Sequence, residues 1–293
     1  MKKLMVAFTA VAMVAAAFAQ EESSKFSFWG FGNYGIYSGY QLYGSLVNDN
    51  PTAQGYVEGN LQYDDLGYIG IGIWSNSDLT KRRSSACNSL GQAFNEWDFN
   101  IHIGRTFWFD DDKTWGLQWR SFVQWYYYPQ ENYAHARESN HTTMDFNHSF
   151  ELVNPFVTPY VCIVREYFNG ANLAVFGLKK TIAINDEMSV TPYIEGVWRE
   201  AQYKWCFPTG FGTYEANGVE NKNSGIATGK VGLDFNYQFA KNFGLFAKVA
   251  YCCITDPDLR DNCDALRDLP YSWYSYGSHK DYAWGAIGLS FNF

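Results

Sequence analysis

Apolar and polar residues alternate along most of the chain after about residue 25. Val57, Gly59 and Leu61 interleave with Glu58 and Asn60, and the same pattern returns in segment after segment. A period of two is typical of β-strands that have one apolar and one polar face. The pattern predicts twelve strands, at residues 26–44, 53–64, 67–77, 96–107, 114–128, 143–153, 156–168, 172–184, 187–200, 224–239, 242–253 and 280–293.

The lengths of the strands and of their connections favour a membrane barrel over a soluble sandwich. Several strands have about ten residues, the length of a tilted membrane strand. The connections after even-numbered strands are short, as at 154–155 and 240–241, whereas most of those after odd-numbered strands are long, as at 78–95 and 201–223. Short turns at one end and long loops at the other are typical of outer-membrane barrels. The prediction is an all-β protein, a single antiparallel transmembrane barrel of about twelve strands.

Composition excludes several other classes of protein. Aromatic residues make up 19% of the 293 residues, which is too many for a disordered chain. The formal net charge of −8 argues against a nucleic-acid partner. The one long apolar run, residues 4–19, is shorter than the roughly 20 residues that a spanning helix needs.

The first nineteen residues have the features of a secretory signal peptide. Lys2 and Lys3 are followed by the apolar run, which ends in the small-residue motif Ala17-Phe18-Ala19. We therefore expect residues 1–19 to be removed and residues 20–293 to form the barrel. With the strand pattern, this predicts a protein of the bacterial outer membrane, in contact with its lipid.

The last strand ends in alternating apolar residues and a terminal aromatic residue. These residues are Ile287, Leu289, Phe291 and Phe293. They resemble the C-terminal sorting signal of outer-membrane barrels, which the barrel-assembly machinery recognises by adding it as a strand at an edge. The resemblance implies that this machinery is a partner.

Five short motifs between residues 37 and 129 resemble the TorF-type porins. They are Ser38-Gly39-Tyr40-Gln41-Leu42-Tyr43-Gly44, Asn50-Pro51-Thr52-Ala53-Gln54-Gly55, Gly72-Ile73-Trp74-Ser75-Asn76, Glu96-Trp97-Asp98 and Tyr126-Tyr127-Tyr128-Pro129. The resemblance implies an outer-membrane location and a porin-like function. In one departure, Tyr43 stands where that family usually has Arg before the glycine.

Strand parity places a set of charged side chains and one histidine in the lumen. The candidates are Glu58, Asp98, His102, Arg120, Asp145, Glu151, Glu195, Arg199, Lys230, Asp234 and Lys248. They could line a narrow aqueous path for small hydrophilic solutes, with six acids against four bases favouring cations. Alternatively, they could pair across the lumen and hold a closed barrel together. The same parity places Arg165 and Lys179 on the lipid side, where a bulge or the headgroup zone could accommodate them.

The main functional hypothesis is a channel for passive diffusion of small hydrophilic solutes. A closed structural or ligand-binding barrel is the alternative, and a membrane-embedded hydrolase using His102 or His148 is a third. The sequence has no soluble-hydrolase, zinc or phosphate-loop motif. We therefore expect no enzyme activity, catalytic residue, cofactor or metal site.

Six cysteines leave two possibilities open in an exported protein. One is a pair of loop disulfides, Cys263 with Cys252 or Cys253 and Cys87 with Cys206. The other is that all of the thiols are reduced and buried. Sequence alone does not decide between them.

Overall fold

The computed structural model describes residues 25–48, 50–79, 96–127, 142–167, 170–202, 223–267 and 279–293. The predicted signal peptide, Cys87 and Cys206 lie outside these residues. Among the described residues, no helix is both long and apolar enough to cross a membrane.

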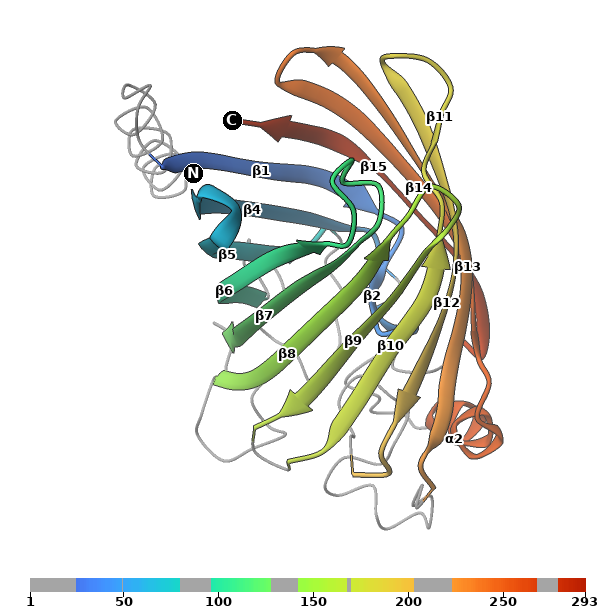
Figure 1. Cartoon of the computed structure of the whole chain (residues 1–293). Coiled ribbons are helices and arrows are strands. Elements are labelled where there is room, and N and C mark those ends of the chain that lie inside the picture. Colours follow the sequence, from blue (N-terminus) through green and yellow to red (C-terminus); the bar gives the residue numbers. More distant parts are fainter. Residues whose placement is uncertain are drawn as a thin grey trace.

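Twelve antiparallel strands form one closed barrel (Figure 1). The strands are β1 (Phe26–Tyr37), β4 (Thr52–Tyr63), β5 (Gly67–Asp78), β6 (Glu96–Trp108), β7 (Gly116–Tyr127), β8 (Thr142–Val153), β9 (Thr158–Glu166), β10 (Asn172–Lys179), β12 (Met188–Arg199), β13 (Gly225–Ala240), β14 (Phe243–Ile254) and β15 (Asp281–Asn292). Each strand pairs with its neighbours in this order, and β1 pairs with β15 to complete the ring. The predicted fold class and the number of barrel strands are confirmed.

Five further elements complete the described chain. They are η1 (Asp64–Leu66), the short strand β11 (Ile182–Ala183), the helix α2 (Pro257–Arg267), and a separate hairpin of β2 (Tyr40–Leu42) and β3 (Ser45–Asn48). Strand β11 pairs with β12 and continues β10 after a break at 180–181, so together they make the predicted strand 172–184.

The ring closes at the C-terminal residue. Gly30 and Phe293 exchange two backbone hydrogen bonds, of 2.9 and 3.0 Å. The Phe293 ring covers Gly30 on the outer surface, where a side chain at residue 30 would collide with it. An aromatic ring packed over a cross-strand glycine stabilises the pairing of two strands. This contact gives the apolar C-terminus a structural role in addition to its predicted role as a sorting signal.

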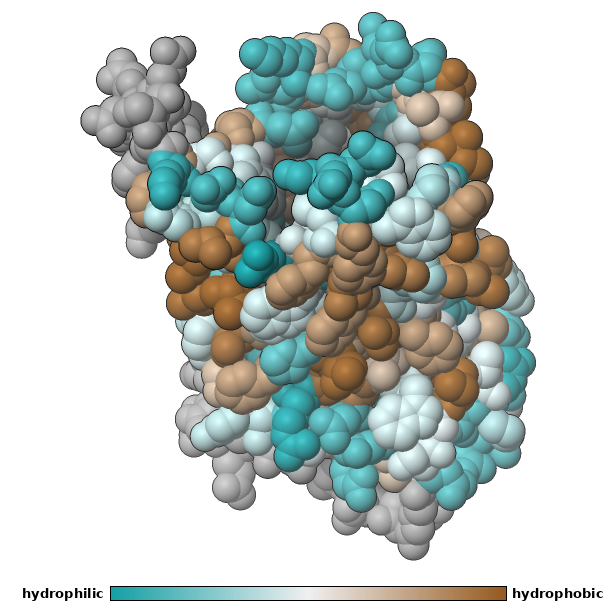
Figure 2. Space-filling model, viewed as in Figure 1, coloured by the Kyte–Doolittle hydropathy of each residue, from teal (hydrophilic) through white to brown (hydrophobic). Residues whose placement is uncertain are grey.

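The outer surface of the barrel is apolar. Large side chains at alternate positions are about half exposed there, including Ile69, Ile71, Ile101, Ile103, Val231 and Val249. Figure 2 shows hydrophobic residues gathered across the middle of one face, with hydrophilic residues above and below them. A closed sheet leaves no unbonded edge, and an apolar exterior matches acyl chains. The chain is therefore a transmembrane β-barrel of the bacterial outer-membrane type.

The first predicted strand is too long. We predicted 26–44, but β1 ends at Tyr37, and residues 40–48 form the β2–β3 hairpin instead. Ser38-Gly39 turns the chain back, and the hairpin then contacts side chains that point into the barrel. Its apolar residues are buried by these contacts, whereas an extended strand would have carried them beyond the rim.

Candidate functional site

The β2–β3 hairpin lies inside the lumen (Figure 1). Its backbone carbonyls at Gly39, Tyr43 and Gly44 accept hydrogen bonds of 2.9, 2.8 and 3.0 Å, respectively. The donors are Trp284 Nε1, Thr228 Oγ1 and Tyr282 Oη, whose side chains point inward from β15 and β13. The hairpin is therefore fixed to the barrel wall at three points.

The turn of the hairpin has an unusual backbone. Tyr43 has φ of 50° and Gly44 has φ of 74°. Two consecutive residues with positive φ form the tight turn that suits two twisted strands, but a side chain at the first position is disfavoured. A side chain at Gly44 would also collide with Thr228. Tyr43, the position where this chain departs from the TorF-type motif, is thus at the tip of a lumenal turn.

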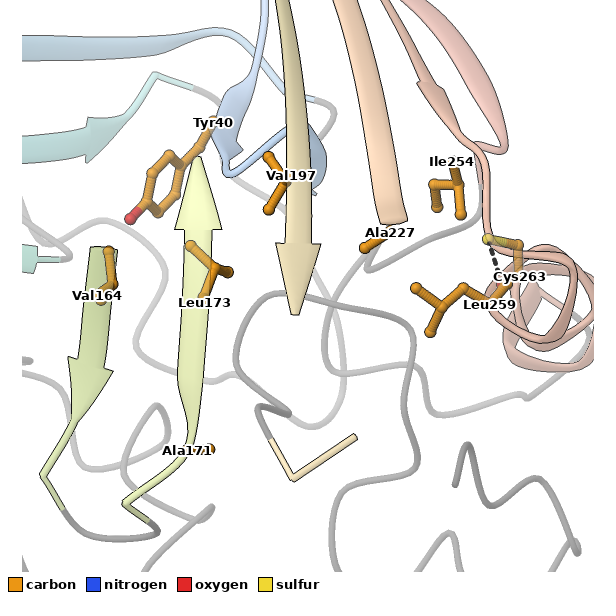
Figure 3. Close-up of a cluster of buried hydrophobic side chains, with 9 residues drawn as sticks. All are labelled: Tyr40, Val164, Ala171, Leu173, Val197, Ala227, Ile254, Leu259 and Cys263. Carbon is orange, nitrogen blue, oxygen red and sulfur yellow. Dashed lines mark hydrogen bonds between the residues drawn. The ribbon is translucent and has the colours of Figure 1, made fainter. Parts of the chain in front are cut away.

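Two apolar clusters anchor the hairpin. Tyr40 belongs to a cluster with residues of β9, β10, β12, β13, β14 and α2, drawn in Figure 3, and its ring lies 5.5 Å from that of Trp74. Leu46 packs with Ala250, Cys252 and Tyr282 from β14 and β15. Because these contacts are on different parts of the wall, the hairpin narrows the lumen near the end where β1 meets its loop.

A cavity of about 490 Å³ lies in the lumen beside β1 and β4–β9. Glu58 is 1% exposed and forms a 2.8 Å ion pair with Arg120, which reaches from β7 across two intervening strands. Tyr56 donates a hydrogen bond to the same carboxylate, and Asn60 donates another at 2.9 Å. Burial of Glu58 is therefore compensated by a cation and two neutral donors.

His102 extends this network to β6. Its Nδ1 lies 2.8 Å from Asn100 Oδ1 and its Nε2 lies 2.7 Å from Asn60 Oδ1. Both ring nitrogens are occupied by structural contacts, and the imidazole is 1% exposed. This geometry suits packing of the lumen rather than proton transfer to a solute.

A second cavity, of about 280 Å³, adjoins the hairpin. Gln41 of the hairpin and Trp284 line it, together with charged residues of β8–β14. Glu151 lines both cavities, so the two lie next to each other along the lumen. Three ion pairs line the smaller cavity: Glu151 with Lys179 at 2.8 Å, Glu195 with Lys230 at 2.5 Å, and Asp234 with Lys248 at 3.3 Å.

Lys179 corrects the prediction from parity. We expected it on the lipid side, but its ammonium group pairs with Glu151 inside the barrel.

Tyr160 and Tyr193 were not predicted from the sequence as lumenal residues. Tyr160 donates a 2.8 Å hydrogen bond to Glu195 from two strands away, and Tyr193 lies under the Lys230 ammonium group, 5.4 Å from its ring centre. The alternation of each strand could have indicated that both tyrosines face the lumen, because an amphipathic side chain is as acceptable on the lumenal face as on the outer face.

Buried acids gather at the loop ends of β6, β8 and β9. Glu96, Asp98, Asp145 and Glu166 are all less than 5% exposed. Gln124 donates a hydrogen bond of 2.9 Å to Asp98, and Tyr126 donates one of 2.9 Å to Asp145.

Arg199, which is completely buried at the loop end of β12, donates hydrogen bonds to the backbone carbonyls of residues 200 and 201. In the described part of the chain, no group of three or more potential ligands is arranged to hold a metal ion.

The predicted bridge between Cys253 and Cys263 is absent from the structure. The Cys253 sulfur lies 3.5 Å from the carbonyl of Gly229, and the Cys263 thiol donates to Leu259 at 3.2 Å (Figure 3). Cys252 points into the lumen, where it is fully buried next to Leu46. The bridge fails because Cys253 is on the outer face of β14, while α2 holds Cys263 inside an apolar cluster.

A serine and a histidine are in contact on the lipid-facing surface. Ser121 Oγ lies 2.7 Å from His148 Nδ1, at the middle of β7 and β8. A hydrolytic triad needs a third group that orients the histidine, and among the described residues His148 has no second side-chain hydrogen bond. Within the ranges that the structure describes, neither His102 nor His148 is part of a serine–histidine–acid triad.

Comparisons with known proteins give no family assignment. No protein-family model matches the chain, and no curated protein matches it. The TorF-type resemblance therefore stays a prediction.

Solved structures of other barrels are similar in outline. The KdgM porin in complex with disordered oligogalacturonate has 6% identity and a TM-score of 0.44, over 90% of this chain and 99% of that one. The NanC porin has 11% identity and a TM-score of 0.46, over 89% and 98%. The translocator domain of the autotransporter NalP from Neisseria meningitidis has 8% identity and a TM-score of 0.42, over 99% and 96%. Sequence identities and TM-scores this low give no information about the solute or activity of this chain.

Proposed function

We propose that this protein is a porin-like channel through which small hydrophilic solutes diffuse passively along a narrow lumen. The observation that carries the proposal is the pair of adjoining cavities, which are lined by charged and hydrogen-bonding side chains and share Glu151. A barrel that served only as a scaffold would gain more stability from an apolar filling than from buried ion pairs.

The β2–β3 hairpin sets the width of this channel. It is held within the ring at both apolar clusters, so a solute must pass beside it. The buried acids at the loop ends of β6, β8 and β9 support a preference for cations, since they place negative potential at that end of the lumen.

Single-channel recording in planar bilayers tests the proposal. We expect small, discrete conductance steps from the folded protein, with a reversal potential in a salt gradient that indicates cation preference. Replacing residues 40–47 with a short Gly-Ser link removes the constriction and should raise the conductance several-fold. A folded barrel that gives no steps, with or without the hairpin, contradicts the proposal.

A closed barrel is the second candidate. The ion pair between Glu58 and Arg120 favours it, because this pair spans part of the lumen between β4 and β7, over two intervening strands. If the hairpin seals the lumen, the intact protein will be silent and only the variant without residues 40–47 will conduct. That result would support the closed barrel.

A further inference from the structure

The smaller cavity contains equal numbers of positive and negative groups. Its charged residues are Glu151, Lys179, Glu195, Lys230, Asp234 and Lys248. In sequence order from β8 to β14 their signs alternate, and Lys230 and Asp234 are both on β13. Each carboxylate forms an ion pair with a lysine, so the wall as a whole has no net charge.

The pairs differ in how accessible they are. Lys230 and Glu195 are only 16% and 14% exposed, so the middle pair is shielded. Lys248 and Asp234 are 37% and 27% exposed, and their separation of 3.3 Å is the longest of the three. Oδ1 of Asp234 is buried and has no hydrogen-bond donor among the described residues. The pair between Glu151 and Lys179 is about equally exposed, at 28% and 35%, so the pair between Asp234 and Lys248 is set apart by its longer separation and by its unpartnered carboxylate oxygen.

When a solute enters the cavity, its charge determines which groups of the wall lose their ion-pair partners. A solute with a single charge can bind only one member of an ion pair, and the other member then loses its partner in a partly desolvated site. A solute with both an ammonium and a carboxylate group can bind both members at once. A wall of alternating charges therefore selects solutes by the number of their charged groups, and not by the sign of their net charge.

We propose that this cavity is a binding subsite for small zwitterionic solutes of the amino-acid type. The proposal rests on the proposed channel function and adds the class of solute. The volume of about 280 Å³ is below the range of pockets for drug-sized ligands and suits a molecule of this size. Thr191 and Gln41 supply further neutral hydrogen-bonding groups at the same cavity.

Four solutes of nearly equal size and shape separate the possibilities. Alanine is a zwitterion, alaninamide a cation, lactate an anion and lactamide neutral. The full-length protein is placed in liposomes held at zero membrane potential, and the initial uptake of each labelled solute is measured. We expect alanine to enter about fivefold faster than each of the other three, the factor that one further partly exposed ion pair provides. Its uptake should also saturate.

The double variant Lys248→Met with Asp234→Asn removes one ion pair and keeps the cavity neutral. Alanine should then lose most of its advantage over lactamide, because the longer of the two accessible ion pairs is gone. The matched control is Lys113→Met with Asp65→Asn, which removes an exposed pair of 3.6 Å between two turns outside the lumen. The control should preserve the preference for alanine.

The outcomes distinguish this proposal from the channel itself. Equal uptake of all four solutes by a conducting protein overturns the subsite and leaves the channel intact. Faster uptake of lactate or alaninamide than of alanine also overturns the subsite. A folded protein that neither conducts nor takes up any of the solutes overturns both proposals.

Discussion

The two faces of the same twelve strands are built from different interactions. On the outer face, side chains such as Ile71 and Val231 are more than half exposed and need no specific partner, since any acyl chain will cover them. On the inner face, Glu58 and His102 are each 1% exposed. The Glu58 carboxylate has three polar partners, and the His102 ring has two. Such positions of the outer face therefore accept different apolar residues, whereas the inner face depends on particular pairs.

A charge placed on the outer face should have the largest effect. Val231→Lys puts an ammonium group among acyl chains near the middle of β13, only one residue from Lys230 on the lumen side. We expect a loss of about 2–4 kcal/mol in the free energy of unfolding, measured by denaturant titration in lipid vesicles.

The control for this variant is Gln118→Lys, which places the same group in the lumen directly opposite Glu151. Its cost should be close to zero, because an opposite charge lies across the strand pair. Similar losses in both variants would show that the two faces do not differ in the way described.

Removal of one member of an inner-face pair should come second. Glu58→Gln leaves the Arg120 guanidinium without its carboxylate. Loss of one partner from a fully buried pair costs 3–5 kcal/mol, and we expect about 2 kcal/mol here because a quarter of the Arg120 side chain is exposed. The same denaturant titration measures this loss.

The double variant Glu58→Gln with Arg120→Met should recover most of that loss. With the single variant Arg120→Met measured as well, the recovery gives the coupling energy of the pair from a complete mutant cycle. If the double variant is less stable than Glu58→Gln alone, the cost lies in packing and not in the unpaired charge.

The difference between the faces also explains what could be predicted from the sequence. Alternation determines which side of the strand a residue occupies, so the twelve strands and the inward position of residues such as Asp234 followed from the pattern. It does not determine the partner. The contact between Glu58 and Arg120 joins strands that are not neighbours, and only the curvature of the closed barrel brings them together.

The β2–β3 hairpin could not be predicted for a related reason. Its residues Tyr40 and Leu42 alternate with polar residues just as the preceding strand does, so the pattern predicted one long strand. Whether such a segment continues past the rim or folds inward depends on apolar partners inside the barrel. Those partners, including Leu173 and Ile254, come from distant parts of the chain.

The attachment of the hairpin provides a smaller test of the inner face. Thr228→Val keeps the shape of the side chain but removes the donor to the Tyr43 carbonyl. A hydrogen bond of this kind contributes about 1 kcal/mol, or roughly a fivefold change in an equilibrium. We expect excursions to higher conductance to become about fivefold more frequent in single-channel records.

Thr191→Val serves as the comparison for this variant. Its hydroxyl group lies 2.9 Å from that of Thr181 and makes no hydrogen bond to the hairpin among the described residues, although Thr191 lines the same cavity as Gln41. The frequency of excursions to higher conductance should be unchanged in this variant. An equal rise in both variants would mean that loss of any lumenal hydroxyl group, and not release of the hairpin, alters the current.

The smallest effect is expected outside both faces, in the turn that connects β6 and β7. The carboxylate of Asp110 accepts hydrogen bonds from the Thr114 side chain and from the backbone N–H groups of Trp115 and Thr114, and these lower its pKa below the usual 3.8. A group whose pKa is lower in the folded state stabilises that state above its unfolded pKa, and this contribution disappears as the pH falls through the folded value. Asp110→Asn should therefore lower stability slightly at neutral pH and bring the two proteins together below pH 3.8. Denaturant titrations of both proteins across this range measure the difference, and a gap that widens on acidification would contradict the assignment.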